Sequence, residues 1–172
     1  MPETMSQGKP FAIYAEFATS NLKMKNGLNR RIFNTVEAQH GFDIHLEKDG
    51  SIRLLGGAYR ITGFSVVTMQ ATMAPPVPLH NNNYPGYCLL YKRDDENNDP
   101  LTNNIGIGSP ATALDTTPSH FDLVINCDKV THICVGQQNG EELNDEVYLA
   151  VYDVDGAKSK YHVFARIAIT RL

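Results

Sequence analysis

The chain has 172 residues, of which 42% are apolar, and a formal net charge of -4. This length and apolar content fit one domain with a single core. The mild negative charge and the lack of a lysine- or arginine-rich cluster argue against a nucleic-acid partner. No apolar stretch approaches the roughly 18 residues that a membrane helix requires, so no membrane insertion is expected.

The first residues predict a loose tail rather than a targeting signal. The opening sequence MPETMSQGKP has no apolar stretch of the kind that a secretory signal peptide carries. We therefore expect residues 1–9 to be a flexible tail and residues 10–172 to form one domain. The localisation stays open between the cytoplasm and export or assembly by a route that needs no signal peptide.

Three cysteines occur in the chain. Cys88, Cys127 and Cys134 follow no spacing that is typical of a zinc or redox motif. Free cysteine is commonly a small buried apolar side chain, so we expect all three to lie in the interior.

Alternation of apolar and polar residues predicts strands from the start of the chain. Pro10–Ala18 is expected to be a first strand and Thr19–Asn29 a polar loop. Arg30–Glu37 is a second extended segment, for which a short helix is the alternative.

The stretch Gly41–Val67 predicts three short strands joined by tight turns. Asp49 and Gly50 lie between two alternating segments, which is a strong hairpin signal. The apolar face of the first strand in this stretch is expected to consist of Phe42, Ile44 and Leu46.

The second half of the chain alternates short strands with polar or proline-rich loops. Loops are expected at residues 70–85, Asp94–Asn104 and Ser109–Ser119. Together with the first half this gives roughly nine or ten strands, which predicts an all-β, two-sheet antiparallel sandwich of the jelly-roll type. The strands expected here are Tyr87–Tyr91, Ile105–Ile107, Phe121–Cys127, Val130–Gln137, Val147–Val151 and Tyr161–Leu172.

Three segments resemble the C1q/TNF-like jelly-roll superfamily. IFNTVEAQHG (Ile32–Gly41) resembles the early strand and loop of a globular C1q-type domain, and IRLLGGAYRITGFSV (Ile52–Val66) resembles its Gly-x-Tyr strand. NDEVYLAVYDVD (Asn144–Asp155) and the following YHVFARIAITRL resemble its last two strands. The order of features from Arg31 onward is similar to that of bacterial or phage C1q-like modules. The resemblance implies a compact homotrimer with a recognition role and no enzymatic activity.

Aromatic residues are candidates for the subunit contacts of such a trimer. Tyr148 and Tyr152 share one face of their strand, so they point outward if the opposite, apolar face is core. With Tyr59 and Phe164 they form the predicted trimer seam. Burial of both faces within one chain stays open, because tyrosine is also frequent inside sandwiches.

The loop HNNNYPGY (His80–Tyr87) is the candidate ligand site because it combines amides with aromatic rings. Amides can fix sugar hydroxyls while a ring stacks on the apolar sugar face, and loops on a rigid scaffold often carry binding sites. The ligand would be a glycan or a protein surface, and the alternative is an ordinary proline-rich connector. The candidate ligand-binding residues are Asn81, Asn82, Asn83, Tyr84 and Tyr87.

No cofactor is expected, although one acidic loop could hold calcium. Asp94, Glu96 and Asn98 alternate in DDENND, and oxygen-rich loops suit Ca²⁺. The loop lacks the glycine and distal glutamate of an EF-hand and could equally be a solvated turn. A cupin-type metal site needs converging histidines, whereas His40 and His45 would point to opposite faces of one strand.

The sequence therefore favours a non-enzymatic, homotrimeric jelly-roll module that recognises a glycan or a protein surface. The second hypothesis is a structural component of a larger particle or appendage, such as a phage fibre. The third is a cupin-type metal-dependent enzyme.

Overall fold

The computed structural model describes residues 8–18, 20–69, 85–93, 100, 102–113, 116–139, 147–151 and 164–172. These residues form antiparallel strands in three sheets, which confirms the predicted all-β class. None of them belongs to a helix that could cross a membrane.

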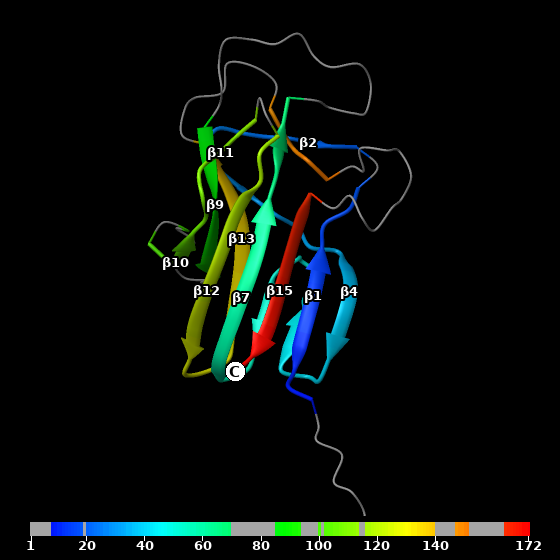
Figure 1. Cartoon of the computed structure of the whole chain (residues 1–172), viewed down its shortest axis with the longest axis vertical. Helices are drawn as coiled ribbons and strands as arrows, with labels where there is room; N and C mark the ends of the chain where they lie inside the picture. The colour runs from blue at the N-terminus through cyan, green and yellow to red at the C-terminus, as the bar shows by residue number, and fades with distance from the viewer. Residues whose placement is uncertain are drawn as a thin grey trace, which may run out of the picture.

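One sheet has five strands and faces the viewer in Figure 1. β1 begins and β15 ends at the same end of this sheet, where the Arg171 N–H donates to the Pro10 carbonyl at 2.9 Å. In order across the sheet, the strands are β12 (Ser119–Cys127), β7 (Gly57–Ser65), β15 (Ala165–Arg171), β1 (Phe11–Ala15) and β4 (Thr35–His40).

A second sheet packs behind the first and completes the sandwich (Figure 1). Its main path is β10 (Asn104–Ile107), β9 (Pro85–Lys92), β13 (Thr131–Asn139), β6 (Ile52–Leu54) and β5 (Ile44–Leu46). Two further strands pair with it, β11 (Ala111–Thr112) on β9 and β3 (Leu28–Arg30) on β13. The two-sheet antiparallel sandwich is the predicted jelly roll.

The core between the two sheets consists of the alternate apolar residues of each strand. Tyr14, Tyr59 and Ile61 from the first sheet and Ile52 and Ile133 from the second are among its fully buried side chains. Cys88, Cys127 and Cys134 are also buried and form no disulfide, as predicted.

A small third sheet lies at the end of the sandwich away from the termini (Figure 1). It consists of β2 (Leu22–Lys23), β14 (Tyr148–Leu149) and β8 (Val67–Thr68). Beneath it is a second apolar cluster that is separate from the main core. Its members are Met24, Val67, Met69, Ala113, Val147, Leu149 and Val151.

The burial of β14 corrects the prediction for Tyr148. The side chains on both faces of β14 are buried, and Tyr148 is only 7% exposed. The tyrosine therefore does not face outward. β14 is the central strand of the third sheet, paired with β2 and β8, and the sequence pattern did not predict this sheet.

A buried ion pair joins the main sandwich to the third sheet. The Arg31 guanidinium, which is fully buried, donates to Glu16 Oε2 at 3.2 Å and to Ser65 Oγ at 2.9 Å. It also donates to the Ala150 carbonyl at 3.0 Å and to the Val66 carbonyl. Since a buried charge is tolerated only when it is paired and hydrogen-bonded, these contacts hold the segments around both clusters in place.

The predicted hairpin at Asp49 and Gly50 is confirmed, because β5 pairs with β6 across this turn. Gly50 has φ 78°, and a Cβ atom there would lie 2.9 Å from Ile32 Cα. The expected core position of Phe42 is wrong: its side chain is 91% exposed. Phe42 precedes β5 and lies in the turn after β4, so the alternation of the strand does not extend to it.

The predicted polar loop Thr19–Asn29 is partly wrong, because β2 and the first residues of β3 lie within it. These short strands owe their conformation to pairing with β14 and β13, which the local sequence does not encode. The predicted extended conformation of Arg30–Glu37 is confirmed over the short helix, since β4 begins inside that segment.

Candidate functional site

The outer face of the five-stranded sheet is the candidate functional surface. Side chains that alternate with the core residues point away from the second sheet, and no described segment lies over them (Figure 1). The strand register aligns them in three rows across the sheet. The rows are His120, Phe64 and Arg166; Asp122, Thr62, Ala168, Ile13 and Ala38; and Val124, Arg60, Thr170, Phe11 and His40.

This face carries exposed apolar side chains. Val124 on the edge strand β12 is 63% exposed, and Phe11 on β1 is 38% exposed. Ile13 and Phe64 are half-buried beside them. A sheet face with apolar groups in the middle and at its edge is typical of a surface that a partner covers.

An open pocket of about 490 Å³ lies on this face, over β7, β12 and β15. Phe64 and His120 both line it, and the centroids of their rings are 5.6 Å apart. Phe121, small residues and two charged residues complete the lining. The full lining is Thr62, Gly63, Phe64, His120, Phe121, Asp122, Arg166 and Ala168.

Two arginine–carboxylate pairs flank the pocket. Arg60 donates to Asp122 at 3.1 and 2.7 Å, and Arg166 donates to Glu37 at 2.6 and 2.8 Å. Both pairs are bidentate, a geometry that fixes the planes of both groups. The hydrogen bonds and charge of Arg60 hold the pKa of Asp122 below its ordinary value. The charges on this face are therefore already matched within one chain.

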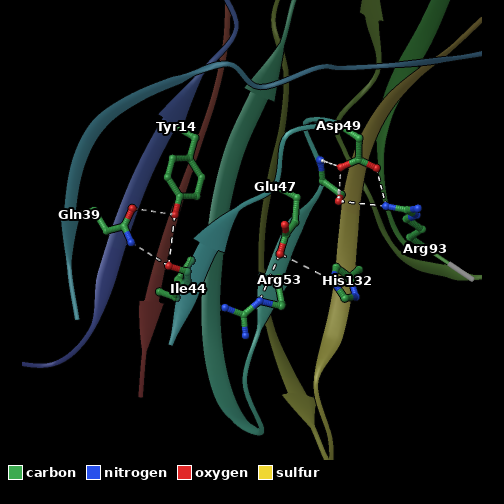
Figure 2. Close-up of polar contacts among 9 residues, drawn as sticks. Tyr14, Gln39, Ile44, Glu47, Asp49, Arg53, Arg93 and His132 are labelled. Atoms are coloured by element: carbon green, nitrogen blue, oxygen red, sulfur yellow. Dashed lines mark hydrogen bonds and ion pairs between the residues drawn. The ribbon is translucent and has the colours of Figure 1, made fainter. Parts of the chain in front are cut away.

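The outer face of the second sheet carries a different arrangement, a network of paired charges (Figure 2). Asp49 accepts from the Ser51 N–H at 3.0 Å, from Ser51 Oγ at 2.6 Å and from Arg93, and lies 3.4 Å from Arg30. Burial opposes the ionisation of Asp49, but these hydrogen bonds and charges outweigh it and lower the pKa.

Glu47 extends this network toward the edge of the sheet. Arg53 Nε lies 3.2 Å from Glu47 Oε1, and His132 Nε2 lies 4.0 Å from the same oxygen (Figure 2). Arg53 on β6 and His132 on β13 thus lie beside Glu47, which follows β5, and the carboxylates of Asp49 and Glu47 each meet at least one cation. We interpret these paired charges as a solvated surface network rather than a ligand site.

Figure 2 also shows how β4 is tied to β5. Tyr14 donates from its hydroxyl to Gln39 Oε1 at 3.3 Å and to the Ile44 carbonyl at 3.4 Å, while Gln39 Nε2 donates to the same carbonyl at 3.0 Å. Burial raises the pKa of Tyr14 to about 12, so loss of the proton that this hydroxyl donates is even less favourable than in an exposed tyrosine.

One nucleophilic side chain lies near a hydroxyl, but the geometry does not activate it. Ser119 Oγ is 3.2 Å from Cys88 Sγ and donates to the Ser109 carbonyl at 2.5 Å. Cys88 is fully buried, and burial raises the pKa of its thiol. A reactive cysteine needs a thiolate and access to substrate, and Cys88 has neither.

The residues predicted to bind metal fall outside the described part of the chain, namely Asp94, Glu96 and Asn98. Among the residues that are described, no three histidine, cysteine or acidic side chains are grouped so as to hold a metal ion. The calcium site therefore stays a prediction.

The predicted sugar-binding loop is described only at its end. Asn81, Asn82, Asn83 and Tyr84 lie outside the described residues, and Tyr87 is half-buried on β9. Tyr87 packs against an apolar cluster on the outer face of the second sheet, formed by Leu89, Tyr91 and Cys134. Its side chain is thus partly used within the fold.

The predicted trimer seam is only partly compatible with the structure. Tyr59 is fully buried in the core and donates to the Leu55 carbonyl at 2.9 Å, so its outward placement is wrong. Tyr148 is buried as well, and Tyr152 lies outside the described residues. Phe164 is half-buried beside Val66, whose N–H donates to the Phe164 carbonyl at 2.9 Å, and it stays a candidate.

The exposed residues of the outer face were missed as candidates. A signal was present in the sequence, because several of these strands carry apolar side chains on both faces. In β1, Phe11 and Ile13 alternate with Ala12 and Tyr14. Ala12 and Tyr14 face the core, although Phe11 and Ile13 are the more apolar pair. A strand that is apolar on both faces predicts that both faces are covered.

Comparisons with solved structures identify the fold. The structure of murine APRIL superposes with a TM-score of 0.60 at 8% identity, covering 96% of this chain and 100% of that chain. The globular domain of zebrafish complement 1qA superposes with a TM-score of 0.51 at 11% identity, with coverages of 96% and 98%. The PRD1 vertex protein P5 superposes with a TM-score of 0.52 at 12% identity, with coverages of 96% and 99%.

These three structures come from different settings and share one architecture with this chain. The chain has the C1q/TNF-like jelly-roll fold, as the resemblance of its segments implied. No family model and no curated protein sequence matches it. At such low identities the likeness defines the fold and no further property.

Proposed function

We propose that the chain is a non-enzymatic module that assembles as a homotrimer and recognises a glycan or a protein surface. The observation that carries the proposal is the outer face of the five-stranded sheet, with Val124 63% and Phe11 38% exposed. A second copy of the chain is the occupant that the fold favours. The implied trimer of C1q/TNF-like modules supports this choice.

The distribution of apolar groups favours a ring of copies over a symmetric pair. Val124 on β12 and Ile107 on β10, which is 57% exposed, lie on neighbouring edge strands along one side of the sandwich. Phe11 and Ile13 lie farther across the sheet. If the side of one copy packs against the outer face of the next, the two contacting surfaces differ and the contact is heterologous. Such contacts close into a ring when the rotation between copies allows it.

Substitution at the edge tests this contact. Val124→Glu places a charge where the next copy would pack, so we expect sedimentation equilibrium to show monomers at concentrations where the wild-type chain is assembled. Val130→Glu is the matched control, because Val130 is 49% exposed in the β12–β13 connection and lies off the face. Loss of assembly in both variants, or in neither, would contradict the proposed contact.

The recognition surface is expected at the loops, with Asn81, Asn82, Asn83, Tyr84 and Tyr87 as the candidate residues. A glycan array probed with the assembled protein tests the carbohydrate ligand. Binding that disappears in Tyr84→Ala would support it. If no glycan on the array is bound and a protein partner binds through the same loop, the ligand is a protein surface.

A structural component of a larger particle is the second candidate function. It is favoured by the likeness to a protein described as a vertex protein of PRD1. Intact trimers that bind neither glycan nor protein in solution would favour this role over recognition.

A further inference from the structure

His120 has a distinctive position on the outer face of the five-stranded sheet. It is exposed and lines the pocket, and its ring lies 5.6 Å from the Phe64 ring at an angle of 52°. Its backbone is fixed by Ser109, whose N–H donates to the His120 carbonyl at 2.7 Å and whose hydroxyl accepts from the His120 N–H at 2.9 Å. These bonds fix the backbone from which the imidazole projects onto this face.

The charged groups that face His120 are already committed to one another. Among the described residues of the face, these groups are Asp122 with Arg60 and Glu37 with Arg166, and each carboxylate takes a bidentate arginine. A proton on His120 would add a positive charge to a balanced set. No carboxylate of this set is left to pair with it.

Water solvates the positive charge of a protonated His120 as long as the face is exposed. If another copy covers the pocket, the imidazolium loses its water without gaining a carboxylate partner from its own chain. Removal of an unpaired charge from water is strongly unfavourable. The covered state therefore favours the neutral imidazole.

We propose that His120 makes self-assembly of this protein sensitive to acid, with the assembled state stable at neutral pH and weakened near pH 5.5. This inference rests on the proposed assembly through the outer face. Histidine is suited to the role because an ordinary imidazole changes its charge between pH 5 and 8. The arginine-paired Asp122 keeps its charge over this range, so it does not compensate.

The sign and size of the effect follow from proton linkage. A group that is protonated in the free chain and neutral in the assembly makes association weaker as the pH falls. One pH unit below an ordinary imidazole titration, the loss is about tenfold in the association constant for each histidine. The effect is cumulative over the copies of one ring.

The test is the oligomer dissociation constant of the full chain at pH 7.5 and at pH 5.5, measured by sedimentation. We expect the wild-type assembly to weaken at pH 5.5 by about tenfold or more. His120→Gln and His120→Phe should keep assembly at both values, because neither side chain can gain a proton and phenylalanine preserves the ring contact with Phe64. Circular dichroism confirms that each variant is folded.

His45 provides the matched control. It is exposed on β5 of the second sheet and lies off the outer face of the five-stranded sheet. His45→Gln should retain the acid response. If it abolishes the response, or if the wild-type assembly is equally stable at both pH values, the role of His120 is refuted while assembly stands. A wild-type chain that is monomeric at pH 7.5 refutes the proposed assembly itself.

Discussion

Arg31 and Glu16 carry opposite charges at a point that water does not reach. The relative exposures of their side chains are 0% and 3%, and Arg31 also donates to Ser65 and to two backbone carbonyls. Buried pairs of this kind contribute little compared with an apolar replacement of both partners, but removal of one partner leaves a buried charge. The pair is therefore sensitive to single substitutions.

Arg31→Met should lower the free energy of unfolding by about 3–5 kcal/mol, because Glu16 is left buried without its cation. Urea denaturation at neutral pH measures this. The control is Arg60→Met, which breaks the exposed pair with Asp122 and should cost far less, because solvent screens both of its charges. Equal losses of unfolding free energy in the two variants would contradict the role of Arg31 in the buried ion pair with Glu16.

Asp49 predicts a dependence of stability on pH. Its pKa in the folded chain lies below the ordinary value of about 3.9, so its contribution is complete above that value and is lost as the pH falls through the folded pKa. At neutral pH, Asp49→Asn should cost about 1 kcal/mol, the size of a part-exposed hydrogen-bonded pair. As the pH is lowered below about 4, the free energies of unfolding of the wild-type protein and of Asp49→Asn should approach each other. A difference between them that stays constant with pH would contradict this account.

At the scale of single elements, the β5–β6 hairpin depends on a glycine that has two separate reasons to be there. Gly50 has a positive φ, and a Cβ atom would lie 2.9 Å from Ile32 Cα. Gly27 also has a positive φ, of 84°, but no heavy atom lies within 4 Å of the place where its Cβ would be. The two residues therefore separate backbone strain from crowding.

Gly27→Ala should cost about 1 kcal/mol, the usual effect of a left-handed alanine. Gly50→Ala should cost about 3 kcal/mol or more, because the backbone near Ile32 has to move as well. Thermal and urea unfolding of the two variants give the comparison. A similar loss in both would mean that the contact with Ile32 yields easily.

Elements with a local signal could be predicted from the sequence. Local patterns of neighbouring residues predict two strands and one turn that the structure confirms. These are the strands Ile52–Leu54 and Ala165–Arg171 and the turn at Asp49 and Gly50. The two-residue strand β2 could not be predicted in this way, because only pairing with the distant β14 defines it. β14 lies within the predicted strand Val147–Val151, but its pairing with β2 and β8 could not be predicted from the local sequence. The same reason explains why Tyr148 was expected to face outward.

At the scale of the whole molecule, the candidate site could be predicted only in part. The alternation in β1 shows two apolar faces but does not indicate which one meets the second sheet, and the structure turns Tyr14 inward and Phe11 outward. The pocket beside His120 forms where β7, β12 and β15 meet, three strands that are far apart in the chain. No local pattern specifies such a meeting point.

The central claim is that three copies of the chain assemble through the outer face of the five-stranded sheet. The most direct measurement is the mass of the wild-type protein in solution at neutral pH, by light scattering or sedimentation equilibrium. The account predicts a single species with three times the 19.1 kDa mass of one chain. A species of 19.1 kDa that persists as the protein concentration is raised would contradict it.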